Sequence, residues 1–212
     1  MKYEWRKKEK DIYLPKEKPM LIEIPKRNYL TVVGAGNPNS SAFSEVVSAL
    51  YSVSYGIRMA PKKGMIPEGY YEYTVYPLEG IWSLNEQGIE QFQKTGQFDK
   101  ANLTFKLMIC QPDFVKESFV LETIARVTKN KPNAYHQALR FETLEEDLAV
   151  QALHLGSYDT EAETFQKMES FCQEYGLERL SPTHKEIYLS DPRKVAPEKN
   201  KTVLRFWVRR VE

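Results

Sequence analysis

The sequence predicts an α+β fold made of two similar halves, each with the order strand, helix, strand, strand. The segments GNPNSSAFSEVVSALYSVSYG (residues 36–56) and GSYDTEAETFQKMESFCQEYG (residues 156–176) both begin with Gly and end in Tyr-Gly, and each has Ala at the seventh position. Each follows an apolar segment and precedes two strand-like runs, at a constant offset of 120 residues. We therefore predict a duplicated unit with pseudo-twofold symmetry and a ligand cleft between the two halves.

The first half is expected at about residues 20–111. Its elements are, in chain order, a strand at 29–35, a helix at 41–55, a strand at 69–78, a short helix at 84–94 and a strand at 102–110. Ser41 is a favourable N-cap residue for the longer helix, and Gly56 is a natural position for its end. Pro77 ends the second strand or places it at an edge. The first 27 residues are interpreted as irregular, and the basic run WRKKEK within them as a solvated arm.

A connecting helix at about residues 112–132 leads to a second half at about residues 133–212. The helix is predicted from an amphipathic spacing of five apolar residues: Phe114, Val115, Phe119, Ile124 and Val127. The second half repeats the order of the first, with a strand at 146–155, a helix at 160–175 and two strands within HKEIYLSDPRKVAPEKNKTVLRFWV, residues 184–208. Gly176 follows the helix as its expected cap.

The final hairpin contains the strongest candidate for chemistry. Alternation along its first strand places Ile187 and the stem of Lys185 on a core face, and His184, Glu186 and Tyr188 on the other face. In a dry groove, burial would raise the pKa of the Glu186 carboxyl and make it a usable general acid or base. On an exposed face it would be an ordinary strand carboxylate, and the sequence leaves both readings open.

The predicted strand at 69–78 offers a similar pattern. Glu72 shares one face with two tyrosines, and Tyr73 lies on the opposite face. Two facing carboxylates, one from each half, would serve acid–base chemistry or hold a cationic ligand together with aromatic faces. The alternative is that these tyrosines only pack across a sheet.

Four further residues are candidates because of their type and their place. Trp82 and Trp207 would either wall a cleft or fill the core. Tyr135 and His136 precede the second half, in a loop that would line a pocket at the junction of the two halves. A single histidine of this kind is more often structural than catalytic, so His136 is included as a binding candidate only.

Composition and missing motifs exclude several classes of function. The net charge of +1 argues against a dedicated nucleic-acid binder. The two cysteines lack metal-ligand spacing, and no GxxxxGK[ST], GxGxxG or GxSxG pattern occurs, so neither a metal nor a cofactor is expected. No apolar segment is long enough for a signal peptide or a membrane span. We expect a cytoplasmic protein that contacts neither membrane nor DNA, and the sequence does not predict its oligomeric state.

The chain resembles the GyrI-like family of small-molecule-binding domains over nearly its whole length. The resemblance is carried by EEDLAVQALHLGSYDTEAETFQKMESFCQEYGLE and above all by the E-x-Y-L-S-D-P-R-[KR] and P-E-K-x-K-T-x-L-R motifs of the last hairpin. It implies a duplicated strand-helix-strand-strand fold with a ligand pocket at its axis. The 27 residues before the first strand are too few for a helix-turn-helix domain, so a stand-alone member is expected.

Among stand-alone members, the chain looks closest to those that hydrolyse cyclopropane-bearing genotoxins. The resemblance implies that Glu186 is the catalytic carboxylate, and that Tyr135 or Tyr188 hydrogen-bonds the ligand carbonyl. The aromatic walls that hold a flat ligand would be Trp82, Tyr73 and Trp207. The alternative function is a module that binds or sequesters bulky aromatic or cationic drugs without turning them over, as effector-binding domains of multidrug-responsive regulators do.

Overall fold

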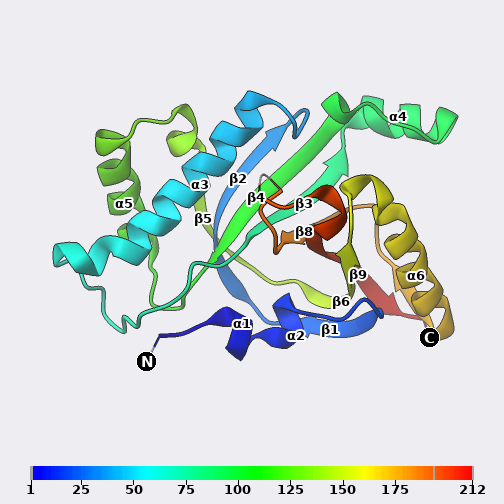
Figure 1. Ribbon diagram of the computed structural model, residues 1–212, viewed down its shortest axis with the longest axis horizontal. Coiled ribbons are helices and arrows are strands. Elements are labelled where there is room, and N and C mark those ends of the chain that lie inside the picture. The colour runs from blue at the N-terminus through cyan, green and yellow to red at the C-terminus, as the bar shows by residue number, and fades with distance from the viewer. Residues whose placement is uncertain (1, 193, 212) are drawn as a thin grey trace. The chain divides into compact units, whose positions relative to one another are not determined.

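A computed structural model describes residues 2–192 and 194–211 of this protein (Figure 1). Arg193, which belongs to the hairpin motif, lies outside the described residues. Within the described chain six α-helices accompany antiparallel strands, which confirms the predicted α+β class. The chain divides into two compact units. The first contains Arg27–Tyr76 and Trp82–Leu144 with Tyr3, and the second contains Glu4–Lys26, Pro77–Ile81 and the residues from Glu145 onward.

The first unit consists of strands covered by two packed helices. Its elements are β2 (Arg27–Ala35), α3 (Ser41–Met59), η1 (Ala60–Lys63), the end of β3 (Leu78–Leu84), α4 (Glu86–Thr95), η2 (Lys100–Asn102), β4 (Leu103–Gln111), α5 (Glu117–Asn130), η3 (Ala134–Ala138) and β5 (Arg140–Leu144). The strand order is β3-β4-β2-β5. Leu30 of β2 is paired with Ile109 on one side and Phe141 on the other, so β2 is a central strand, and it is buried from Tyr29 to Val32. Helix α3 lies along β2 and β4 and packs against α5 (Figure 1).

Helix α3 differs from its prediction at both ends. Ser40 rather than Ser41 is the N-cap, and its Oγ accepts a hydrogen bond from the backbone N–H of Phe43 at 3.2 Å. The helix continues past Gly56 to Met59. A Cβ at Gly56 would lie 2.8 Å from Val127 Cγ2 and 2.9 Å from Thr123 Cγ2, both on α5. Gly56 therefore permits the close approach of α3 and α5, and it does not end the helix.

The prediction of a strand at residues 69–78 is wrong. Residues 70–75 are irregular apart from a single bridge between Tyr3 and Tyr73, and β3 begins only at Leu78, directly after Pro77. The tyrosines of this segment gather around one side chain instead of alternating across a sheet. The rings of Tyr70, Tyr71 and Tyr73 all lie 5.1–5.9 Å from that of Phe114.

The second unit places one helix over a second set of strands. Its elements are α1 (Trp5–Lys8), α2 (Lys10–Tyr13), β1 (Met20–Ile24), the start of β3, β6 (Asp147–Leu155), η4 (Tyr158–Thr160), α6 (Glu161–Glu174), β7 (Leu177–Arg179), β8 (His184–Tyr188), η5 (Pro197–Lys199) and β9 (Lys201–Arg210). The strand order is β1-β6-β9-β8-β3, and β7 pairs with the far end of β9. Gly176 after α6 has a φ of +60°, as expected of a helix cap.

The core of the second unit lies between α6 and the strands β6 and β9. Its buried side chains are Val150, Ala152, Met168, Cys172, Leu177, Leu204, Phe206 and Val208. β6 begins 120 residues after β2, and α6 begins 120 residues after α3. This is the same offset that separates the two repeated sequence segments. The strand–helix order thus recurs along the chain, and the pseudo-twofold relation itself stays a prediction.

The N-terminal segment contains short helices and a strand, contrary to the prediction of an irregular, solvated arm. Trp5 and Tyr13 are 3 % and 1 % exposed, and their rings pack 5.2 Å apart. β1 then pairs antiparallel with β6. The two aromatic side chains anchor the segment, because each removes a large apolar surface from water, while most of the charged residues between them stay exposed.

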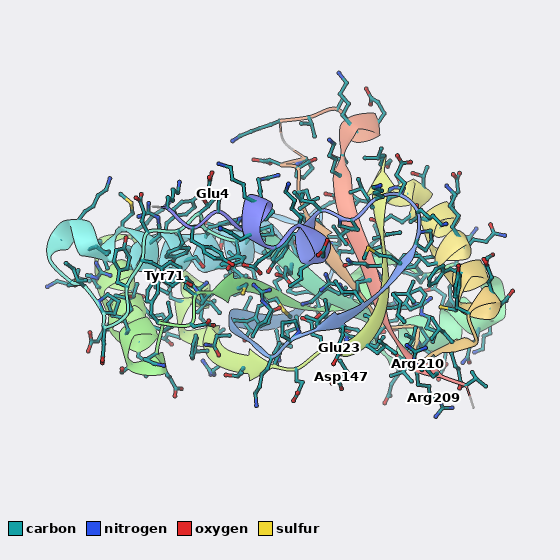
Figure 2. The ribbon with its side chains drawn as sticks, turned by 90° about the horizontal axis from the view of Figure 1, so that it is seen from below. Glu4, Glu23, Tyr71, Asp147, Arg209 and Arg210 are labelled. Atoms are coloured by element: carbon teal, nitrogen blue, oxygen red, sulfur yellow. The ribbon has the colours of Figure 1, made fainter. Side chains whose placement is uncertain are left out.

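Charged residues lie at the solvent-exposed ends of strands in the second unit. Glu23 near the end of β1 and Asp147 at the start of β6 lie side by side, and Arg209 and Arg210 end β9 (Figure 2). All four are exposed. Asp147 has a φ of +49°, a left-handed conformation that Asp tolerates better than most residues.

Candidate functional site

Strand β8 has one charged residue on each face, in two different environments. In its pairing with β9, Glu186 is opposite Leu204 and Lys185 is opposite Arg205. Because paired residues of antiparallel strands share a face, Glu186 lies on the face covered by α6. The predicted alternation along this strand is therefore confirmed: Lys185 and Ile187 are fully buried, and His184, Glu186 and Tyr188 are partly buried.

The Glu186 carboxylate is mostly enclosed and has a histidine partner. Its side chain is 12 % exposed, and Oε1 lies 3.1 Å from His184 Nε2, which can donate its ring N–H. The His184 ring in turn lies against Phe165 of α6, with centroids 4.9 Å apart. Tyr188 follows on the same face of the strand and packs edge-on against Tyr158 at 6.1 Å.

A second carboxyl belongs to this group of residues, and sequence reasoning missed it. Glu161 is the first residue of α6, is only 8 % exposed, and has no hydrogen-bond partner for its Oε1 among the described residues. Burial, together with the negative charges of Glu186 and Asp159, raises the pKa of Glu161 to about 10. Burial, with the negative charges of Glu186, Glu161 and Asp191, raises the pKa of Tyr158 to about 12.

We call these residues the Glu186 cluster: Tyr158, Glu161, His184, Glu186 and Tyr188. Two neighbouring carboxyls in unlike surroundings, one enclosed without a partner among the described residues and one held by a histidine donor, can take separate acid and base roles. The cluster thus brings together an enclosed carboxyl, a second carboxyl with a histidine donor, and two phenol groups. The only sequence signal for Glu161 was its place at the start of a helix, which predicts no burial.

The opposite face of β8 contains a buried charge network that the sequence did not reveal. The ammonium group of Lys185 is fully buried and pairs with Glu79 Oε2 at 2.7 Å and with Glu146. Arg205 donates to Glu146 at 3.2 Å and to Gln151 at 2.8 Å. The sequence placed the stem of Lys185 on the core face, and in the structure the charged end is buried there as well.

The two tryptophans predicted to form walls of a ligand pocket differ in their surroundings. Trp82 is 5 % exposed and packs with Phe43 at 5.8 Å and Phe105 at 5.5 Å in the first unit. Trp207 is half-buried on β9, opposite Ala149. Their roles as ligand walls stay predictions.

Tyr73 and Glu72 point to different environments, as the sequence predicted. Tyr73 is 1 % exposed, and its hydroxyl has no hydrogen-bond partner in the described chain. Burial raises its pKa. Glu72 is largely exposed and forms an ion pair with Arg58 at 2.5 Å. Glu72 and Tyr73 belong to the first unit and Glu186 to the second, so their joint role stays a prediction.

Tyr135 and His136 lie in η3 of the first unit, where His136 has a structural setting. Its Nε2 lies 2.9 Å from Ser52 Oγ, and its Nδ1 lies 3.0 Å from Thr128 Oγ1. Ser52 donates its own hydroxyl hydrogen to the Ala49 carbonyl at 2.8 Å. Nε2 must therefore donate to Ser52 and Nδ1 accept from Thr128, which satisfies a neutral ring and leaves Ser52 unsuited to act as a nucleophile. Tyr135 is half-buried beside it.

We expect His136→Ala to lower the free energy of unfolding by about 1–3 kcal/mol at pH 7.5, because Ser52 and Thr128 lose their partner. Burial lowers the pKa of His136. Its neutral form thus stabilises the fold fully above the ordinary pKa near 6.5, and this contribution declines as the pH falls through the lowered pKa. Urea denaturation at pH 7.5 and pH 5.0 measures this, with His184→Ala as control. An equal loss from the wild type and His136→Ala on acidification would contradict the assignment.

Two further properties concern the described residues alone. No group of three or more His, Cys, Asp or Glu side chains is arranged there to hold a metal ion. No described helix has the length and apolar character that a membrane span requires.

Comparison with known proteins identifies the family. The model of the GyrI-like small molecule binding domain matches residues 17–209. The solved structure of a hydrolase from Listeria innocua is 32 % identical, with a TM-score of 0.87 over 98 % of this chain and all of the other. An uncharacterized conserved protein from the same species is 34 % identical, with a TM-score of 0.87 over 98 % of this chain and all of that one.

A more distant structure shares the fold alone. The C-terminal domain of EcmrR is 14 % identical, with a TM-score of 0.55 over 91 % of this chain and 98 % of that one. No curated protein matches this chain. The family match spans most of the chain, and it includes β8 with the Glu186 cluster. This protein therefore belongs to the GyrI-like family of small molecule binding domains.

Proposed function

We propose that this protein hydrolyses cyclopropane-bearing genotoxic small molecules without a cofactor, with Glu186 as the catalytic carboxylate. The observation that carries the proposal is the Glu186 carboxylate itself, which is 12 % exposed, paired with His184 and accompanied by two tyrosines. A structural carboxylate at a sheet surface would be solvated or would pair with a cation. The similarity to a Listeria innocua hydrolase over the whole of that chain supports the same reading.

The proposed reaction adds one water molecule to the ligand. Glu186 accepts a proton from water as the water oxygen forms a bond to a ring carbon. The strained C–C bond breaks, and its electron pair moves to a conjugated carbonyl oxygen, which takes up a proton. Glu186 then returns its proton to solvent, so the net change is ring opening by water.

Tyrosine hydroxyls would stabilise the charge that develops on the carbonyl oxygen. Tyr188 supports this role because it follows Glu186 on the same face of β8, and Tyr135 is the second candidate from the sequence. Aromatic walls of Trp82, Tyr73 and Trp207 would hold a flat ligand. The recurring spacing of β2-α3 and β6-α6 supports the further proposal that the fold is a duplicated unit. Free, buried Cys110 and Cys172 fit activity in a reducing cytoplasm.

Turnover tests the proposal directly. The purified protein is mixed with a panel of cyclopropane-bearing DNA-alkylating compounds, and ring-opened product is followed by mass spectrometry against heat-inactivated protein. We expect a product that has gained one water, formed equally fast by Glu163→Gln, a variant of an exposed residue on α6. Saturable quenching of tryptophan fluorescence without product from any compound would overturn the hydrolase and leave a drug-binding module.

A further inference from the structure

We propose that Glu161 keeps its proton at neutral pH and acts as a positioning residue that keeps Glu186 as the ionised base. This inference rests on the proposed hydrolysis for its catalytic consequence, but the protonation of Glu161 can be measured without any ligand. The starting observation is that Glu161 is more than nine-tenths buried, yet its Oε1 has no partner among the described residues. An ionised carboxylate in that position would lack the hydrogen bonds that a buried charge requires.

The surroundings of the two carboxyls assign the proton to Glu161. Glu186 has a ring N–H donor from His184 at 3.1 Å and remains partly exposed, so its negative charge is compensated. Among the described residues, the charged groups that act on Glu161 are Glu186 and Asp159, and both oppose a further negative charge. The amino end of α6 favours an anion, but this effect is small beside burial and two acidic neighbours.

No described cation forms an ion pair with Glu161, and Lys194 in the loop after β8 is largely exposed and pairs with Asp191 at 3.7 Å. From η4, Tyr158 and Asp159 face the cluster, and Asp191 acts on Tyr158 from the loop after β8. From β6, His154 has its two ring nitrogens engaged with Thr164 Oγ1 at 2.9 Å and the Ser157 carbonyl at 3.0 Å. His184 of β8 is committed to Glu186.

The consequence for catalysis concerns Glu186. If Glu161 were ionised, the two adjacent negative charges would favour protonation of one of them, and Glu186 would lose its capacity to accept a proton from water. A neutral Glu161 avoids that repulsion. Because a neutral Glu161 exerts no such repulsion, replacing it with neutral Gln should leave the acid limb of the pH–rate profile unshifted, whereas removal of an ionised Glu161 would move that limb to lower pH.

Infrared spectroscopy of the free protein tests the protonation. At pH 7 we expect a protonated carboxyl band in the wild type, in Glu186→Gln and in the control Glu163→Gln, and we expect its loss in Glu161→Gln. In Glu186→Gln, where one negative neighbour is removed, the band should titrate away at a lower pH than in the wild type. A wild type without the band at pH 7, or a band that disappears in Glu186→Gln and persists in Glu161→Gln, would overturn the proposal.

The pH dependence of turnover tests the catalytic consequence. In both proteins turnover should rise with pH along the same acid limb, because Gln and a protonated Glu161 are both neutral. An acid limb that lies at a lower pH in Glu161→Gln than in the wild type would show that an ionised Glu161 opposes the charge of Glu186, and would overturn the positioning role. If no compound is turned over, the infrared result still decides the state of Glu161, so failure of the hydrolase and failure of this inference are separate outcomes.

Discussion

Replacing Lys185 with Met should lower the free energy of unfolding by about 3–5 kcal/mol, the usual cost of removing one partner from a buried ion pair. The Lys185 ammonium group is 0 % exposed and lies between Glu79 and Glu146, which are 1 % and 4 % exposed. Met fills a similar volume, so the loss comes from two buried carboxylates that lose their cation. Arg205 still contacts Glu146, but Glu79 keeps only the hydroxyl of Tyr13 at 3.2 Å.

Lys106→Met is the matched control for this change. Lys106 also pairs with a glutamate at 2.9 Å, but its side chain is 26 % exposed and Glu142 is 35 % exposed. Water therefore screens the Lys106 pair, and its loss should cost about 1 kcal/mol or less. Guanidinium denaturation of the wild type and both variants at pH 7 gives the comparison. Equal stability of the two variants would contradict a buried, paired ammonium at position 185.

The same network explains why the N-terminal segment is ordered, which the sequence did not predict. Arg205 donates to the backbone carbonyl of Ile12 at 2.8 Å, and the Gln151 amide donates to that of Asp11 at 2.6 Å. Glu79, Glu146 and Arg205 are far apart in sequence and meet only through strand pairing. No local pattern marks such partners, because a buried charge looks in sequence like any surface charge.

The elements that were predicted well are those that depend on local periodicity. The strand before each helix, the two long helices and the last hairpin all follow from alternation or from a 3.6-residue stripe. The segment at 69–78 failed because its tyrosines alternate in sequence but pack around Phe114 in space. The prediction that Gly56 ends its helix failed for a similar reason, because only the approach of α5 shows why glycine is needed at this position.

The candidate site was predictable in part. The face of Glu186 and Tyr188 followed from alternation on β8, and the structure places Tyr158 and His184 beside them. Glu161 was missed because a Glu in the first turn of a helix is ordinarily solvated and stabilised there by the helix dipole. Its burial depends on how α6 packs over β8, which is a tertiary property.

Glu186→Gln should lower the turnover of a cyclopropane-bearing compound by about 10²–10⁴-fold, the usual contribution of a general base. Gln keeps the shape and can still accept a hydrogen bond from His184, but it cannot take a proton from water. The dissociation constant for a neutral ligand should therefore change little, and the loss should appear in kcat rather than in KM. Single-turnover kinetics with mass spectrometry measures the rate, and tryptophan fluorescence measures binding.

Glu163→Gln is the matched control for this last variant, because Glu163 is an exposed glutamate on the neighbouring helix. A Glu186→Gln protein that turns over ligand at the wild-type rate would remove Glu186 from the chemistry. Weaker binding of cationic ligands alone, with neutral ligands bound as before, would instead make Glu186 a recognition residue. Only a loss of rate with retained affinity distinguishes a base from a counter-ion, because a counter-ion acts on the ground state and a base acts in the transition state.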